Sequence, residues 1–181
     1  MTYTNAFAAS RWKKTTLIAA PWVLLLSTYL VYQGAVALVG TKLGYLFGFL
    51  FYWIVWCLGL SLWILGPDGV VAQFRDRQPR LTSKRWLGIL LLLLPLLLAY
   101  GYEFPRALPQ ATLPVVLASA VISIVNGLGE ELLWRGVYVS VFPDSVWWGY
   151  LYPTIGFAVW HFAPQSVFPN PRPGATVSSV S

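Results

Sequence analysis

The stretch Leu17–Val39 reads LIAAPWVLLLSTYLVYQGAVALV and contains no charged residue. A transmembrane α-helix needs about 20 consecutive apolar residues to cross about 30 Å of hydrocarbon, so this stretch predicts a membrane-spanning helix. It follows the basic segment RWKKTT, which begins at Arg11, and it is too long for the apolar core of a signal peptide. We therefore expect a membrane anchor that is retained.

Further apolar runs follow along the chain. They are Leu43–Leu65, Trp86–Tyr102, Leu113–Val125 and Val146–Phe162. The first of them is rich in Gly and Ser, which let neighbouring helices approach closely in a membrane. The predicted fold class is therefore all-α: a polytopic transmembrane helix bundle with about five membrane segments over residues 1–164. Residues 165–181 are rich in Pro and Ser and are expected to form a tail outside the membrane.

The composition supports a membrane protein. The chain is 57% hydrophobic and only 10% charged, whereas a soluble domain has about a quarter of its residues charged. The net charge is +6, and the basic residues cluster in Arg11–Lys14 and between Arg75 and Arg85. Basic clusters beside apolar runs follow the positive-inside rule. We expect an integral multi-pass protein with a cytoplasmic amino terminus, a cytoplasmic loop at Gly66–Arg85, and Lys42 and Arg106 on the opposite side. The expected partner is the lipid bilayer and not nucleic acid, because no basic face alternates with exposed aromatic residues.

A charged stretch interrupts this apolar chain. The sequence NGLGEELLWRGVY, Asn126–Tyr138, contains Glu130, Glu131 and Arg135. On a helix, Glu131 and Arg135 are four residues apart with the acid first, which favours an ion pair. Glu130 points about a hundred degrees away and is not held by that pair, so the two carboxylates should differ in environment. The alternative is that the stretch lies at the bilayer surface, where its charges are solvated. The glycines before the pair fit either close helix packing or a turn.

The chain has one histidine, His161, in GFAVWHFAP, four residues after Phe157. A lone histidine at an apolar helix end is more often structural than catalytic. Here, however, the glutamates and the histidine come from consecutive membrane segments and can meet across a helix pair. A carboxylate can deprotonate a water for attack on a carbonyl, and an imidazole can orient that water. The same side chains could ligate a hydrolytic metal, although neither HExxH nor HxxEH is present. The single cysteine, Cys57, lies within an apolar run and is expected to pack as a small apolar residue.

Taken together, Glu130-Glu131-x-x-x-Arg135 and Phe157-x-x-x-His161 resemble the two motifs of the CAAX-protease and bacteriocin-processing family, also called CPBP or Abi. The family consists of intramembrane glutamic endopeptidases. The resemblance implies that Glu130 activates the attacking water and that Glu131 and Arg135 shape and neutralise the site. It also implies that His161 positions the water and the scissile carbonyl. The implied substrate is a peptide or protein, which is prenylated in the eukaryotic branch. No cofactor is implied, and zinc enters only through an older view of the family as metalloproteases.

One feature departs from the family pattern. The resemblance covers the core from about Leu113 to Pro164, but the family supplies another histidine, with an Asn or Asp four residues on, from later helices. His161 is the only histidine of this chain. We therefore expect either a carboxy-terminally truncated or frameshifted copy or the family scaffold with little or no activity. The alternatives to an intramembrane endopeptidase are a non-catalytic membrane scaffold or bacteriocin-immunity-type protein of the same family, and a zinc-dependent membrane hydrolase.

Overall fold

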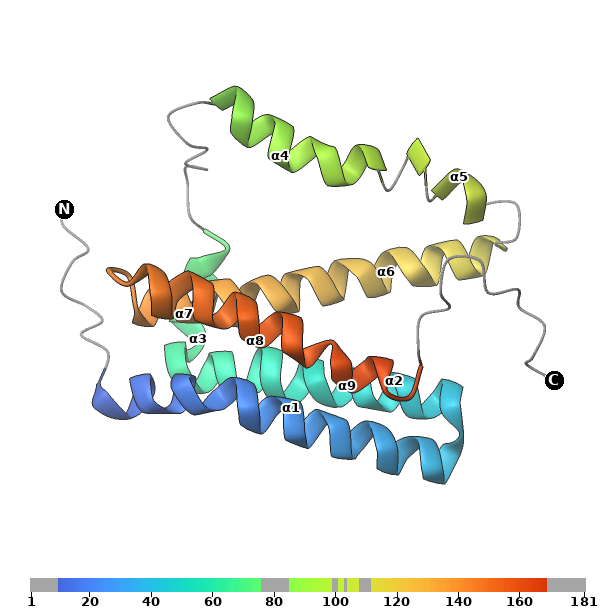
Figure 1. The fold of residues 1–181 in the computed structure, drawn as a ribbon, viewed down its shortest axis with the longest axis horizontal. Coiled ribbons are helices and arrows are strands. Elements are labelled where there is room, and N and C mark those ends of the chain that lie inside the picture. Colours follow the sequence, from blue (N-terminus) through green and yellow to red (C-terminus); the bar gives the residue numbers. More distant parts are fainter. Residues whose placement is uncertain (1–9, 76–84, 99–100, 103, 108–111, 169–181) are drawn as a thin grey trace. The chain divides into compact units, whose positions relative to one another are not determined.

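The computed structural model describes residues 10–75, 85–98, 101–102, 104–107 and 112–168. All regular elements within these residues are helices (Figure 1), which confirms the predicted all-α class. The chain folds as two compact units. The first unit consists of residues 1–70 and 128–181, and the second consists of residues 71–127.

The first unit begins with a long helical hairpin. Helix α1, Arg11–Val39, contains the predicted Leu17–Val39 span without a break. It ends at Gly40, whose φ of 80° lies in the left-handed region that glycine enters at little cost. Helix α2, Thr41–Phe51, starts directly afterwards and packs back along α1 (Figure 1).

The second predicted span continues from α2 into a π-helical segment, η1 (Tyr52–Leu60), and then α3 (Ser61–Gln73). Within the described residues, α1 and the continuous stretch Thr41–Gln73 are the two helices long and apolar enough to cross a membrane. The other predicted membrane segments remain predictions as far as crossing is concerned.

The structure corrects the predicted loop after the second span. Gly66 has a φ of 74° and kinks α3, and Pro67 follows it. Proline suits the first turn of a helix because the missing N–H has no partner there, so a short helix restarts at this point. The chain is therefore helical as far as Gln73, where the sequence predicts a loop. Residues 76–84 of that loop lie outside the described residues.

Two buried glycines bring α2 against α1. A Cβ atom at Gly44 would lie 2.5 Å from the backbone nitrogen of Val36. A Cβ atom at Gly48 would lie 2.1 Å from ring carbons of Tyr32. Distances this short leave no room for a side chain, so the predicted close approach through small residues is confirmed for this pair of helices.

The carboxy-terminal part of the first unit covers this hairpin. Its elements are η4 (Glu131–Val137), α7 (Tyr138–Val141), η5 (Trp147–Leu151), α8 (Tyr152–Trp160) and α9 (Phe162–Gln165). Helices α8 and α9 pack along α1 (Figure 1). The segment η4 packs on η1 and α8. The Tyr138 hydroxyl donates to the Leu17 carbonyl at 2.8 Å, which ties α7 to α1. This arrangement places the two motif segments beside η1.

The second unit contains α4 (Arg85–Leu98), α5 (Phe104–Ala107) and most of α6 (Leu113–Glu130). The predicted runs at Trp86 and Leu113 are thus helical where the structure describes them. Helix α6 continues through Gly127 and Gly129 without a turn. The chain therefore enters the charged stretch as a helix. The alternative that these glycines form a turn is wrong.

Candidate active site

The predicted ion pair is present on η4. The Arg135 guanidinium donates to the Glu131 carboxylate one helical turn earlier. Both side chains are largely exposed, Arg135 at 71% and Glu131 at 58%. The next residues, Leu132, Leu133 and Trp134, are buried, so the ion pair lies on the outer side of η4.

Glu130 has a different environment. It ends α6 and is half-buried, whereas Glu131 is largely exposed. The residue before Glu130, Gly129, lies against Cys57 of η1. The two adjacent glutamates thus have distinct surroundings, as predicted from their positions on a helix.

Close backbone packing brings the charged stretch to η1. A Cβ atom at Gly129 would lie 3.3 Å from the Cβ atom of Cys57. Cys57 is buried and packs into the core as predicted. Because a larger side chain at Gly129 would push the two segments apart, this glycine helps to hold Glu130 near η1.

Tyr52 connects the elements around Glu130. Its hydroxyl accepts a hydrogen bond from the Trp134 indole nitrogen at 2.8 Å. Its ring stacks on Trp160, with centroids 4.0 Å apart and planes 19° from parallel. Phe157 completes the group, 5.7 Å from Trp134 and 6.2 Å from Trp160 between centroids. We call Tyr52, Trp134, Phe157 and Trp160 the aromatic layer.

His161 lies at the end of α8, beside the aromatic layer. Its ring meets Phe157 edge-to-face at 4.6 Å and Trp160 at 5.0 Å. Nδ1 lies 2.8 Å from the Phe157 carbonyl oxygen. A carbonyl only accepts hydrogen bonds, so Nδ1 carries the proton and Nε2 holds the lone pair in the neutral ring. The shared face of Phe157 and His161 is therefore confirmed, and the backbone fixes the tautomer.

The aromatic layer links the segment that carries the candidate acid to the candidate histidine. Trp134, four residues after Glu130, donates to the Tyr52 hydroxyl, Tyr52 stacks on Trp160, and Trp160 contacts His161. The two motifs thus reach the same layer from consecutive segments, whereas Glu131 and Arg135 lie on the outer side of η4. The sequence did not identify Tyr52 or Trp134 as neighbours of the site.

The described residues do not fit a zinc site. Zinc in hydrolytic enzymes is held by three protein ligands drawn from His, Cys, Asp and Glu. In the part of the chain that the structure describes, no group of three such side chains comes together.

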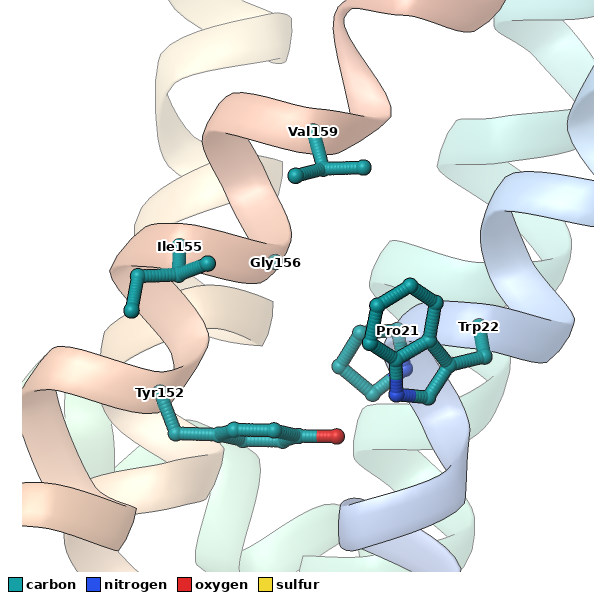
Figure 2. A pocket seen from close by; sticks show the side chains of 6 residues that line it. All are labelled: Pro21, Trp22, Tyr152, Ile155, Gly156 and Val159. Atoms are coloured by element: carbon teal, nitrogen blue, oxygen red, sulfur yellow. The ribbon is translucent and has the colours of Figure 1, made fainter.

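A small apolar pocket of about 30 Å³ lies between α1 and α8. Figure 2 shows its lining residues, Pro21 and Trp22 from α1 and Tyr152, Ile155, Gly156 and Val159 from α8. The Tyr152 hydroxyl points towards α1 (Figure 2), where it donates to the Ile18 carbonyl. The pocket has room for little more than one water molecule and lacks a charged lining residue, so it offers no site for chemistry.

Comparison with protein families identifies the segment that carries the motifs. Residues 111–179 match the family described as Type II CAAX prenyl endopeptidase Rce1-like. This segment, somewhat over a third of the chain, is therefore similar to the CAAX protease family. The matched segment contains both Glu130-Glu131-x-x-x-Arg135 and Phe157-x-x-x-His161, so the resemblance inferred from these motifs is confirmed. Neither a comparison with curated proteins nor one with solved structures gives a match.

Proposed function

We propose that this chain is an intramembrane endopeptidase of the CAAX protease family in which Glu130 activates the attacking water. The observation that carries the proposal is the contrast between the two glutamates. Glu131 is paired with Arg135 on an exposed surface, whereas Glu130 is half-buried at the end of α6, next to Gly129, which packs against Cys57. An ionisable side chain in an apolar surrounding is costly to maintain and is typically functional.

The proposed reaction is a hydrolysis with Glu130 as general base. Glu130 takes a proton from the water while the water oxygen bonds to the carbonyl carbon of the peptide. Collapse of the tetrahedral intermediate breaks the carbon–nitrogen bond, and the Glu130 carboxyl returns the proton to the leaving amine. His161 orients the water, because Nδ1–H is held by Phe157 and Nε2 can accept a hydrogen bond from the water. Glu131 and Arg135 are assigned to shaping and neutralising the outer side of the site.

The proposed substrate is a peptide or protein that reaches the site from the lipid bilayer. The family description names a prenyl endopeptidase, so the first probe is a fluorogenic peptide farnesylated on the cysteine of a carboxy-terminal Cys-aliphatic-aliphatic-X sequence. The same peptide without the farnesyl group is the matched probe. Equal cleavage of the two peptides would show that the chain hydrolyses the peptide bond without recognising the farnesyl group.

The test is cleavage by the purified chain in detergent. We expect Glu130→Gln to lower kcat by a factor of about 10²–10⁴, which is the usual contribution of a general base. Asp144→Asn is the control, because Asp144 is an exposed carboxylate in a turn away from both motifs. Cleavage that persists in Glu130→Gln would remove Glu130 as the base.

A non-catalytic membrane protein of the same scaffold is the second candidate function. It is favoured by the single histidine, since the family motif expects another one to help bind the oxyanion. In that case the double variant Glu130→Gln/His161→Ala would still complement a strain in which the gene is deleted. The wild-type chain would cleave neither peptide. Cleavage that is lost with a chelator and restored by zinc would instead support the zinc-dependent hydrolase.

A further inference from the structure

Helix α1 contains a proline, and the helix continues through it. Pro21 lies between the basic start of α1 and the rest of the span. Proline has no N–H, so the carbonyl of Leu17, four residues earlier, receives no hydrogen bond from position 21. Leu17 is 0% exposed, and a buried carbonyl without a partner costs free energy. Another group must therefore serve this carbonyl.

Two tyrosine hydroxyls from the carboxy-terminal part of the first unit bind α1 at this point. The Tyr138 hydroxyl donates to the Leu17 carbonyl at 2.8 Å, in a buried hydrogen bond. The Tyr152 hydroxyl donates to the next carbonyl, that of Ile18. Tyr138 begins α7 and Tyr152 begins α8, so two separate elements hold the turn of α1 directly before Pro21. In membrane proteins, neighbouring helices commonly satisfy the backbone groups that a proline frees.

The Pro21 ring lies against α8 at Gly156. A Cβ atom at Gly156 would lie 2.9 Å from the Cβ atom of Pro21 and 3.0 Å from Cζ3 of Trp134. Gly156 therefore lets the proline ring and Trp134, a member of the aromatic layer, approach the same point of α8. Pro21 and Gly156 also line the small apolar pocket between α1 and α8 (Figure 2). A missing backbone hydrogen bond, an unfilled pocket and two hydroxyl contacts thus lie together where α1 meets α8.

We propose that Pro21 is a hinge in α1 and that the Tyr138 and Tyr152 hydroxyls are latches that hold residues 11–20 against α7 and α8. Helices bend at proline, because one hydrogen bond of the helix is missing there. Both latch hydrogen bonds are formed in the structure, which is therefore the closed state. Their release lets residues 11–20 turn away about Pro21, which widens the apolar pocket and uncovers the side of Trp134 that faces α1. The hinge does not depend on the proposed hydrolysis.

Distances between spin labels test the hinge. In a Cys57→Ser background, which removes the single cysteine, Ser10→Cys and Thr154→Cys place one label at the start of α1 and one at an exposed position of α8. Ser10 lies about 16 Å from Pro21 at 1.5 Å per residue, so a rotation of about 20°, a typical proline kink, moves it by about 5 Å. We expect the distance between the labels to lengthen by about 5 Å when both latch hydroxyls are removed.

The variant that removes the latches is Tyr138→Phe/Tyr152→Phe, which keeps both rings. An unchanged distance in this variant would overturn the proposal. The label pair Leu30→Cys/Thr154→Cys is the matched control, because Leu30 is exposed and follows the hinge on α1, and its distance should stay the same. Tyr29→Phe, at an exposed tyrosine of the same helix, should change neither distance. Equal lengthening of both label pairs would show a general loosening of the unit and would contradict the hinge.

Pro21→Ala tests whether the hinge lies at the proline. Alanine supplies the N–H that proline lacks, so the Leu17 carbonyl is bonded within the helix. The triple variant Pro21→Ala/Tyr138→Phe/Tyr152→Phe should therefore return to the wild-type distance of the first label pair. A triple variant that keeps the longer distance would show that α1 bends elsewhere.

Thermal unfolding tests the latch at Tyr138 without labels. Tyr138→Phe should lower Tm, because it leaves the buried Leu17 carbonyl without its hydroxyl partner. In a Pro21→Ala background the helix itself serves that carbonyl, so the same substitution should lower Tm less. Equal losses of Tm in the two backgrounds would show that the Tyr138 hydroxyl does not serve the carbonyl that Pro21 frees, and would overturn its role as a latch.

Discussion

The ion pair between Glu131 and Arg135 is a feature whose energetics can be tested residue by residue. Exposed ion pairs contribute about 0–1 kcal/mol to stability. We expect the outer side of η4 to be in contact with water, because hydrolysis at the adjacent Glu130 requires water to reach it. Glu131→Gln and Arg135→Gln should then each lower the free energy of unfolding by less than about 1 kcal/mol, measured by thermal unfolding in detergent.

The double variant Glu131→Gln/Arg135→Gln is the control for that prediction. A charge left alone in lipid is strongly destabilising, whereas removal of both charges is not. Single variants that lose several kcal/mol, together with a double variant that recovers the loss, would place the pair in lipid. If cleavage falls in variants whose stability is unchanged, the pair acts on the site rather than on the fold.

The residues predicted correctly from the sequence are those whose relation is local. Glu131 with Arg135 and Phe157 with His161 are four apart, and the periodicity of a helix alone brings such side chains together. Tyr52 and Trp134 could not be paired in this way, because they are 82 residues apart in the sequence. Trp134 lies within the first motif and Trp160 precedes His161, so their positions in the sequence were the indication that they pack near the site. The apolar runs contain many aromatic residues, however, and the sequence alone did not distinguish those that pack at the site from those that lie at the membrane interface.

At the scale of the elements, the contact between α1 and α2 depends on Gly48. We expect Gly48→Ala to destabilise the unit by about 1–3 kcal/mol, because the added methyl group would overlap the Tyr32 ring and force the helices apart. Thermal unfolding in detergent measures this loss.

Gly34→Ala provides the matched control on the partner helix. Gly34 lies within α1, and a Cβ atom there would meet no atom within 4 Å. Because alanine is the better helix former, this variant should be neutral or more stable by up to about 1 kcal/mol. Equal losses in the two variants would mean that glycine is needed for a reason other than the contact with Tyr32.

The helices themselves were largely predictable, because long apolar runs have few alternatives in a membrane protein. Leu17–Val39 and Leu43–Leu65 both lie within helices of the structure. The error fell at Gly66, where a glycine and a proline signal a turn in the sequence but act here as a kink that restarts the helix. Such a signal specifies a change of direction, and the contacts beyond it decide whether a loop or a helix follows.

At the scale of the whole molecule, the distribution of basic residues predicts how the chain is oriented. Helix α1 has 29 residues and is therefore about 44 Å long at 1.5 Å per residue, enough to place its ends on opposite sides of a bilayer. Lys13 at its start donates to the Ile64 carbonyl at 2.6 Å, so the start of α1 and the end of the second span lie together. This pairing agrees with the predicted hairpin, in which both ends are cytoplasmic.

Cysteine labelling can test that orientation, because Cys57 is the single cysteine of the chain. In a Cys57→Ser background, Ser10→Cys marks the start of α1 and Lys42→Cys marks the turn between α1 and α2. By the positive-inside rule, we expect a membrane-impermeant maleimide to label Lys42→Cys in intact cells and Ser10→Cys only after the membrane is opened. The reverse pattern would show that the chain is inverted, and labelling of both sites in intact cells would show that α1 does not cross.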